Sequence, residues 1–363
     1  MKMLMTGGPV FEYLDSVKII TNKFKGGRMA KLAESICDLG VEVYYLCSKD
    51  SVKPERVTSL IFHNGFDDYK EKVLSISPNV DAVLLGAAVS NLIPNSPWRN
   101  IKFPSHKYKE GDKVNIEFTV APRIINMVKE VAPNTKLIGF KLLSNFDHKE
   151  LVDVAYTSLL ESRASFIIAN DTKKLDDKFI VTKEKSEIPL QECDLPRFIV
   201  SSIKDEYYST EFSEEKRTPC SSDFEHICDK YSQQLISGYD FSRNILFGCV
   251  ALRNNNGFIV SSRGKRAMNE TTDVVYVDHD NRKVKIRGNK KASLNAPLID
   301  MVFKTVPKAV SVVHYHQTDN ELITLPYAFP GTIRDSLRNI PGHSFNIEYH
   351  GTFLLLDKEG KAL

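Results

Sequence analysis

The segment Thr6–Glu34, TGGPVFEYLDSVKIITNKFKGGRMAKLAE, decides the fold of the N-terminal half. It follows a short apolar strand, Lys2–Met5, and leads into a helix predicted over Gly27–Leu39. Apolar residues at positions 32, 33, 36 and 39 recur at helical spacing, and Gly40 ends the helix. The order of strand, glycine turn, loop and helix predicts the first unit of an α/β domain.

The same alternation continues along the chain. Further strands are predicted at Val41–Leu46, Ala82–Leu85, Leu137–Phe140 and Phe166–Ala169, and further helices at Ile124–Val131 and Lys149–Leu160. Short, continuously apolar strands that alternate with helices are what a parallel sheet covered on both faces requires. We therefore expect an α/β domain with a doubly wound, Rossmann-like parallel sheet.

Length and composition are those of an ordinary globular protein with two domains. The chain has 363 residues, of which 42% are hydrophobic and 26% are charged. A net charge of +3 is too small to favour a nucleic-acid partner. The longest apolar run, Ala82–Val89, is far shorter than a membrane span needs. The six cysteines form no CxxC pair, and we expect reduced thiols. No signal peptide is recognised, so we expect a cytoplasmic protein with no membrane partner.

The pattern changes in the C-terminal half. We expect a domain over residues 1–205, a charged, Ser/Thr-rich linker over 206–221, and a second domain over 222–363. The second domain contains short β-type runs separated by turns, one helix at Ala296–Phe303, a strand that ends in HYH and a final strand TFLLL. These features predict an α+β domain with a largely antiparallel sheet.

Ligands of an open parallel sheet bind where its strands end, so residues after strands are candidates for a site. Gly7 and Gly8 follow the first strand, and Gly26 and Gly27 open the first helix. Paired glycines let backbone N–H groups approach a phosphate at a helix N-terminus, although a plain tight turn explains them equally well. Small residues in Gly86–Asn91 could admit a nucleotide or simply allow close packing. Lys141 directly follows a strand, whereas a loop lysine such as Lys107 is usually only solvated.

Together these segments carry a resemblance that no single motif establishes. Thr6–Glu34, GAAVSN (86–91), HKYK (106–109), LIGFKLL (137–143) and IIANDT (167–172) are similar in order and spacing to phosphopantothenoylcysteine synthetase. The resemblance extends to about residue 183, and it is stronger to the free-standing bacterial form than to the form fused to a flavin decarboxylase. It implies a ligase of coenzyme A biosynthesis, in which a nucleotide activates the carboxylate of 4′-phosphopantothenate for attack by cysteine.

The resemblance also implies roles for individual residues. Asn22 would hold the acyl-nucleotidylate and assist the amine step, Lys18 would bind the substrate phosphate, and Lys107 would contact the triphosphate. CTP or ATP with Mg²⁺ would be required. The nucleotide would be bound by Gly7, Gly8, Gly26, Gly27, Ala87, Ala88, Asn91, Lys107, Phe140, Lys141 and Asn170.

This sequence departs from the synthetase pattern at three places. The usual Ser-Ser before the glycine is Phe24-Lys25, a later glycine is Met29, and the aspartate after AAV is Asn91. A lost carboxylate at Asn91 alters metal, ribose or base contacts. A different carboxylic acid, activated by the same route, is therefore an alternative substrate.

Three histidines stand out in the second domain. His314 and His316 are two residues apart in a predicted strand, so both side chains point to the same face. With His350 they would form a three-nitrogen site with an open position, which is typical of catalytic zinc, although an isolated HxH is more often structural. ILFGCVALR, GFIVSSRGK, VVHYH and YHGTFLLL resemble the class II aldolase/adducin family, which implies that these histidines bind Zn²⁺ or a similar metal. Asn295 stands where that family has its acid/base glutamate, so standard aldol cleavage is not expected.

Three interpretations of the whole chain follow. It is a ligase with an appended metal-binding domain, a bifunctional enzyme that activates another carboxylate, or a ligase whose C-terminal domain is a non-catalytic oligomerisation module. The partners expected are small molecules, namely a nucleotide, a phosphorylated acid and an amine such as cysteine. A homo-oligomer is also expected.

Overall fold

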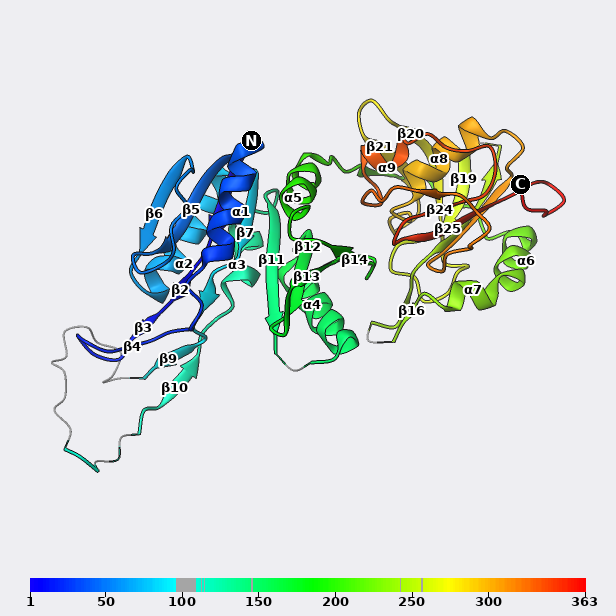
Figure 1. Cartoon of the computed structure of the whole chain (residues 1–363). Coiled ribbons are helices and arrows are strands. Elements are labelled where there is room, and N and C mark those ends of the chain that lie inside the picture. The colour runs from blue at the N-terminus through cyan, green and yellow to red at the C-terminus, as the bar shows by residue number, and fades with distance from the viewer. Residues whose placement is uncertain (96–108, 112, 114, 145, 242, 256) are drawn as a thin grey trace. The chain divides into compact units, whose positions relative to one another are not determined.

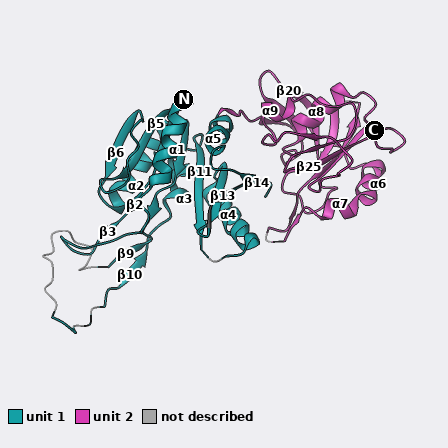
Figure 2. Ribbon diagram, viewed as in Figure 1, with its two compact units in different colours: residues 1–203 teal, residues 204–363 magenta. Residues whose placement is uncertain are grey.

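The computed structural model describes the chain except for residues 96–108, 112, 114, 145, 242 and 256. The side chains of residues 174–176 are also outside the description. The chain divides into two compact units, Met1–Ile203 and Lys204–Leu363 (Figure 2). Each unit has its own sheet and is described by itself.

Unit 1 is built on an eight-stranded sheet (Figure 1). Its order is β14-β13-β12-β11-β7-β1-β5-β6, and the six strands from β12 to β6 are parallel. In chain order the parallel strands lie as 3-2-1-4-5-6, which is the Rossmann order. The strands are β1 (Lys2–Thr6), β5 (Glu42–Ser48), β6 (Ser59–His63), β7 (Ala82–Leu85), β11 (Lys136–Leu143), β12 (Phe166–Asp171), β13 (Lys174–Val181) and β14 (Glu187–Leu190). The expected doubly wound parallel sheet is confirmed, with the antiparallel pair β13–β14 added at one edge.

Helices cover this sheet, and their apolar positions explain where they pack. α1 (Gly27–Asp38) buries Met29, Ala30, Leu32, Ala33 and Ile36. α2, α3 and α4 contact one another in turn and form one layer, whereas the right-handed crossover from β1 to β5 places α1 on the other face. α4 begins with a capping box between Asp147 and Glu150. The remaining bounds are α2 (Phe66–Ile76), η1 (Ser77–Asn79), α3 (Ile124–Val131), α4 (His148–Ser162) and α5 (Leu195–Lys204).

Short paired strands extend from the carboxyl edge of this sheet. β3 pairs with β4, β9 pairs with β10, and β2 pairs in parallel with β8. None of these pairs was predicted, because strands of two or three residues carry no period that a sequence pattern could reveal. They are β2 (Pro9–Val10), β3 (Glu12–Tyr13), β4 (Ile19–Ile20), β8 (Ala88–Val89), β9 (Leu92–Pro94) and β10 (Phe118–Val120).

Unit 2 has a nine-stranded sheet of order β15-β21-β20-β19-β18-β22-β25-β24-β23. Only its two edge pairs, β15–β21 and β23–β24, are parallel, so the expected, largely antiparallel sheet is confirmed. The strands are β15 (Ser209–Ser213), β18 (Cys249–Asn254), β19 (Gly257–Ser261), β20 (Thr271–Asp278), β21 (Lys283–Arg287), β22 (Ser311–Tyr315), β23 (Thr324–Leu325), β24 (Phe345–Ile347) and β25 (Gly351–Leu356). A separate pair joins β16 (Tyr239–Asp240) to β17 (Ile245–Leu246).

The sheet of unit 2 carries a hydrophobic core on each face. The larger core includes Val312 and Phe353 and is covered by α8 (Ala296–Thr305). The smaller core includes Val313 and lies under α6 (Ser222–Lys230) and α7 (Ser232–Ile236). One further short helix, α9 (Ile333–Ser336), contacts α8. Because successive residues of a strand point to opposite faces, Val312 and Val313 belong to different cores.

The prediction that residues 206–221 form a linker between the two domains is wrong. The units divide between Ile203 and Lys204, and Ser209–Ser213 forms the edge strand β15 of the second sheet. Residues 209–213 (STEFS) alternate too weakly in polarity to predict a strand from the sequence. They form one because they pair with β21. The segment is therefore part of unit 2.

Among the described residues, no helix has both the length and the apolar composition that a membrane crossing requires.

Candidate functional site

The topological switch point of unit 1 lies between β1 and β7. The chain order of the strands reverses there, and ligands of such sheets bind outside the carboxyl ends of the strands at this point. Gly7 and Gly8 directly follow β1, and Gly86 and Ala87 directly follow β7. The glycine and alanine turns predicted from the sequence therefore meet at one edge.

Gly8 and Gly26 approach each other too closely for any side chain. A Cβ atom on Gly26 would lie 2.3 Å from the backbone nitrogen of Gly8, and Gly26 has a φ of 84°. This left-handed conformation is readily adopted by glycine alone. Gly27 is the first residue of α1, so the turn presents the N-terminus of that helix at the edge of the sheet.

Asn22 is held at this edge by a hydrogen bond. Its Nδ2 donates to the carbonyl oxygen of Ala88 at 3.0 Å, and the N–H of Ala88 donates to the carbonyl oxygen of Gly8 at 2.9 Å. Four predicted residues from three separate segments, namely Gly8, Asn22, Gly26 and Ala88, are thus connected through direct contacts.

Tyr69 is a residue of this edge that sequence reasoning missed. Its hydroxyl lies 3.1 Å from Oγ1 of Thr6, and that same oxygen accepts the N–H of Ala87 at 3.2 Å. Tyr69 is only 1% exposed and comes from α2, a helix that was not predicted. No local signal could have found it, because a tyrosine in an amphipathic helix is usually only a core residue.

The other predicted residues lie at varying distances from this turn. Phe140 and Lys141 are on β11, the neighbour of β7, and burial, followed by the charge of Arg123, lowers the pKa of Lys141. Asn170 is one strand further out, on β12 beside β11. Asn91 is exposed after β8. Lys107 lies outside the described residues.

Lys18 lies in the turn between β3 and β4. Its ammonium donates to Oδ2 of Asp15 at 2.9 Å, and Oδ1 of Asp15 accepts the N–H groups of Val17 and Lys18. The hydrogen bond from Lys18 and that from Val17 lower the pKa of Asp15 to about 2. Asp15 therefore stays ionised and holds the lysine in this turn.

In unit 2, the three predicted histidines lie together on the α8 face of the sheet. One ring nitrogen from each of His314, His316 and His350 lies within 4.8 Å of the others. Nδ1 of His314 donates to the carbonyl oxygen of Thr352 at 2.9 Å, which leaves its buried Nε2 without a hydrogen-bond partner among the described residues. A ring fixed in this way presents a free lone pair, which is how protein-bound histidines are prepared for a metal.

Burial keeps these imidazoles neutral. It is the main cause that lowers the pKa of all three rings, to about 4 for His316 and well below the usual value for His314 and His350. The neighbouring rings lower the pKa values of His314 and His350 further. Neutral imidazole is the form that binds a metal ion.

Asn295 lies at this cluster, whereas Asp300, a carboxylate of the following helix α8, is engaged elsewhere. Oδ1 of Asn295 is 3.3 Å from Nε2 of His350. Asp300 accepts from His279 at 2.8 Å and pairs with Lys304 at 2.7 Å. The side chain beside the histidines is therefore an amide, which has no ionisable proton to transfer at neutral pH.

Residues 1–197 match the family described as the DNA/pantothenate metabolism flavoprotein C-terminal domain. The chain belongs to this family. A family member from Streptococcus pneumoniae, a DNA/pantothenate metabolism flavoprotein of known structure, is 27% identical with a TM-score of 0.51, and the match covers 56% of this chain and 98% of that one. The S. pneumoniae structure therefore supports the fold of the DNA/pantothenate metabolism flavoprotein family for about half of the chain.

Two other similarities are more limited. The coenzyme A biosynthesis bifunctional protein CoaBC of Thermococcus kodakarensis is 30% identical over 174 residues, which is 47% of this chain and only 41% of that protein. The l-fuculose-1-phosphate aldolase of Thermus thermophilus is 16% identical with a TM-score of 0.25, covering 38% of this chain and 80% of that one. A TM-score this low carries no argument about fold.

Proposed function

We propose that unit 1 is a nucleotide-dependent ligase of coenzyme A biosynthesis that joins 4′-phosphopantothenate to cysteine. The observation that carries the proposal is the contact between Asn22, Ala88, Gly8 and Gly26 at the switch point of the sheet. The family match over residues 1–197 and the similarity to the T. kodakarensis coenzyme A biosynthesis protein support the same pathway. The sequence resemblance supplies the reaction type.

The reaction has two steps. A carboxylate oxygen of the acid attacks the α-phosphorus of CTP or ATP, the bond to the β-phosphate oxygen breaks, and pyrophosphate leaves. The amine of cysteine then attacks the acyl carbon, the nucleoside monophosphate leaves with the bonding electron pair, and the nitrogen loses a proton. Negative charge develops on phosphate oxygens in the first step and on the acyl oxygen in the second, so fixed N–H donors at those positions lower both barriers.

The glycine turns fit the first step. The missing side chains of Gly7, Gly8 and Gly26 let this turn pack closely on Tyr45, on Ser51 and on itself. The N-terminus of α1, which begins at the turn, would bind a phosphate through its backbone N–H groups and its dipole. The half-buried Lys141 is on β11, which β7 separates from β1, and its ammonium adds a positive charge at the same edge of the sheet. These groups would bind and orient the triphosphate.

Asn22 fits the second step. Its Nδ2 is committed to the carbonyl oxygen of Ala88, which fixes the amide plane and leaves Oδ1 to accept a hydrogen bond from the attacking amine. An accepted hydrogen bond would orient the nitrogen lone pair toward the acyl carbon. Asn22 would thus position the amine without itself taking up a proton.

Mg²⁺ is expected with the triphosphate, because this ion binds through phosphates and one or two carboxylates. Asp171 ends β12 at the same edge, and its buried Oδ2 has no hydrogen-bond partner among the described residues. An orphaned carboxylate oxygen fits a hard cation. Asp171 would hold the ion, which neutralises charge on the phosphates when bound.

Pyrophosphate release tests the ligase proposal. The full chain, supplied with CTP or ATP, 4′-phosphopantothenate and cysteine, is expected to release pyrophosphate only when nucleotide and acid are both present. Asn22→Asp should block amide formation, because a carboxylate cannot donate to the Ala88 carbonyl and repels phosphates. The matched control is Asn79→Asp, an exposed asparagine at the opposite end of β7. Equal turnover in both variants would refute the assignment.

We further propose that His314, His316 and His350 bind one Zn²⁺ or similar ion in unit 2. Two observations support the binding of such an ion by these residues. Three ring nitrogens converge, and the buried Nε2 of His314 has no hydrogen-bond partner among the described residues. Such an ion, when bound, polarises a hydroxy-carbonyl substrate. With Asn295 beside it in place of a carboxylate, little aldol cleavage of sugar phosphates is expected.

Elemental analysis of protein purified without chelator tests the metal site. We expect close to one transition metal per chain, lost in His314→Ala and kept in His226→Ala, which changes an exposed histidine of α6 in the same unit. Metal-free wild-type protein that also fails to take up added Zn²⁺ would refute the site. Equal metal content in the two variants would refute it as well.

A further inference from the structure

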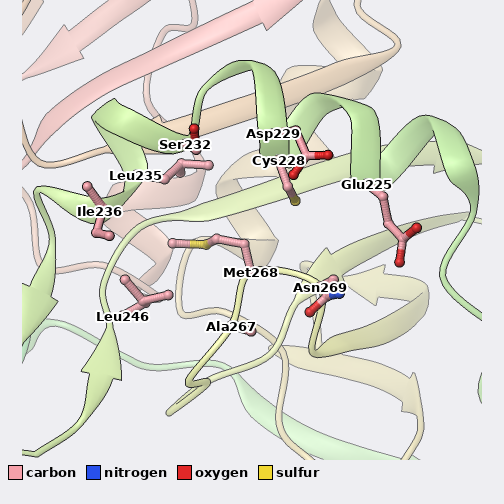
Figure 3. A pocket seen from close by; sticks show the side chains of 10 residues that line it. All are labelled: Glu225, Cys228, Asp229, Ser232, Leu235, Ile236, Leu246, Ala267, Met268 and Asn269. Atoms are coloured by element: carbon pink, nitrogen blue, oxygen red, sulfur yellow. The ribbon is translucent and has the colours of Figure 1, made fainter.

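Unit 2 contains a second candidate site, a cavity of about 350 Å³ between α6, α7 and the segment 267–269 (Figure 3). Leu235 and Met268 line it and belong to the smaller core, together with Val313. His314 is the next residue of β22 and points to the other face of the sheet. The cavity is therefore separate from the histidine cluster, and its volume is in the range of small-molecule sites.

One wall of the cavity is apolar. Leu235, Leu246 and Met268 line it, and Ile236 adds a side chain that is 66% exposed. Figure 3 shows these side chains on the side away from Glu225. A ligand that covers this wall removes apolar surface from water, which favours binding by roughly 25 cal/mol per Å².

The other wall carries two carboxylates. Glu225 and Asp229 both line the cavity and are four residues apart on α6, so their side chains are neighbours of like charge. In the described part of the chain, neither carboxylate has an ion-pair or side-chain hydrogen-bond partner. A cation bound here would relieve their repulsion.

None of the described residues that line the cavity carries a positive charge. Burial raises the pKa of Cys228 to about 12, so its thiol is neutral at pH 7. Lys265 is buried and does not line the cavity, and its ammonium donates to the carbonyl oxygens of Leu246 and Gly248. Asn269 lines the cavity and offers an amide oxygen to a donor. The cavity thus combines an apolar wall with hydrogen-bond acceptors and negative charge.

We propose that this cavity binds a small primary alkylamine. The ammonium group, with three donors, lies against Glu225, Asp229 and Asn269, and the alkyl chain packs on Leu235, Leu246 and Met268. Carboxylates and phosphates are excluded because both charged groups of the wall are negative. This ligand class is independent of the ligase reaction proposed for unit 1.

Calorimetric titration of the full chain with pentylammonium chloride tests the proposal. 1-Pentanol has the same alkyl chain without the charge, and pentanoate has the opposite charge. We expect saturable binding of pentylammonium, weaker binding of pentanol and no binding of pentanoate. Exposed ion pairs are worth about 0.2–1 kcal/mol each, so Glu225→Gln and Asp229→Asn should each weaken pentylammonium binding by roughly 1.4- to 5-fold.

Control variants separate the two walls. Asp223→Asn changes an exposed carboxylate of α6 that does not line the cavity, and should leave the affinity unchanged. Met268→Ala should weaken pentylammonium and pentanol by the same factor. The proposal is overturned if pentylammonium shows no saturable binding, if pentanol binds as tightly, or if the double variant Glu225→Gln/Asp229→Asn retains wild-type affinity.

Discussion

Replacing Gly26 with alanine probes the close approach of two backbone segments at the switch point. Gly26 and Gly40 both have a positive φ, 84° and 83°, but they have different surroundings. A Cβ atom on Gly26 would lie 2.3 Å from the nitrogen and 2.6 Å from the Cα of Gly8, whereas one on Gly40 would meet nothing within 4 Å. Gly40→Ala therefore measures the cost of the left-handed conformation by itself.

That conformational cost is about 1–2 kcal/mol for a non-glycine residue. This cost is partly offset because alanine also restricts the backbone of the unfolded chain. The offset is similar in the two variants. In Gly26→Ala the backbone of Gly8 must also move, and forced overpacking of this kind costs typically about 1–3 kcal/mol. The free energy of unfolding of unit 1 should therefore fall by about 1–3 kcal/mol more in Gly26→Ala than in Gly40→Ala.

Urea unfolding, followed by hydrogen exchange of peptides from unit 1, measures this difference without interference from unit 2. Gly26→Ala should also weaken nucleotide binding, because Gly8 is displaced, while Gly40→Ala should leave it unchanged. Equal loss of stability in the two variants would show that Gly8 and Gly26 are not in contact, and would remove the main geometric support for a phosphate site at this turn.

Three further changes test other parts of unit 1. Burial lowers the pKa of His63 to about 4, below the 6.5 of an unfolded histidine. The unfolded state therefore binds the proton first, and the free energy of unfolding falls as the pH drops from 6.5 to 4. His63→Phe should abolish this loss, up to roughly 3 kcal/mol, in urea unfolding at pH 7 and pH 4.5; an unchanged pH dependence would contradict it. Tyr69→Phe removes the hydrogen bond to Thr6 and should lower the free energy of unfolding by about 1 kcal/mol. It should also raise KM for the nucleotide, and by more than this amount when the change in KM is expressed as a free energy; an unaltered KM would leave Tyr69 a core residue. Lys107→Gln should lower kcat/KM on the order of ten- to a thousandfold, and an unaffected rate would make Lys107 a solvated loop lysine.

Much of the fold of unit 1 could be predicted because its signals are local. Apolar runs such as Ala82–Leu85 identify strands, and the spacing of apolar residues in Gly27–Asp38 identifies a helix. In unit 2, the period of two in a strand likewise places His314 and His316 on one face from their spacing alone. These features depend only on neighbouring residues.

Other features depend on contacts between distant segments. The order of the strands places β1 beside β7, and this neighbourhood brings Asn22 to the carbonyl of Ala88. Pairing of β22 with β25 brings His350 to His314, and pairing with β21 makes residues 209–213 a strand. α6, α7 and the segment 267–269 likewise form the cavity only after they pack.

The physical reason for this division is that the sequence by itself determines which side of each element is apolar and where a chain can turn. It does not determine which apolar faces meet, because many pairings bury similar areas and the hydrophobic effect is non-directional. Packing of the whole core selects one pairing, and steric fits such as that of Gly26 on Gly8 then hold it. The residue types of the sites were therefore visible in the sequence, whereas their convergence was decided by the tertiary structure.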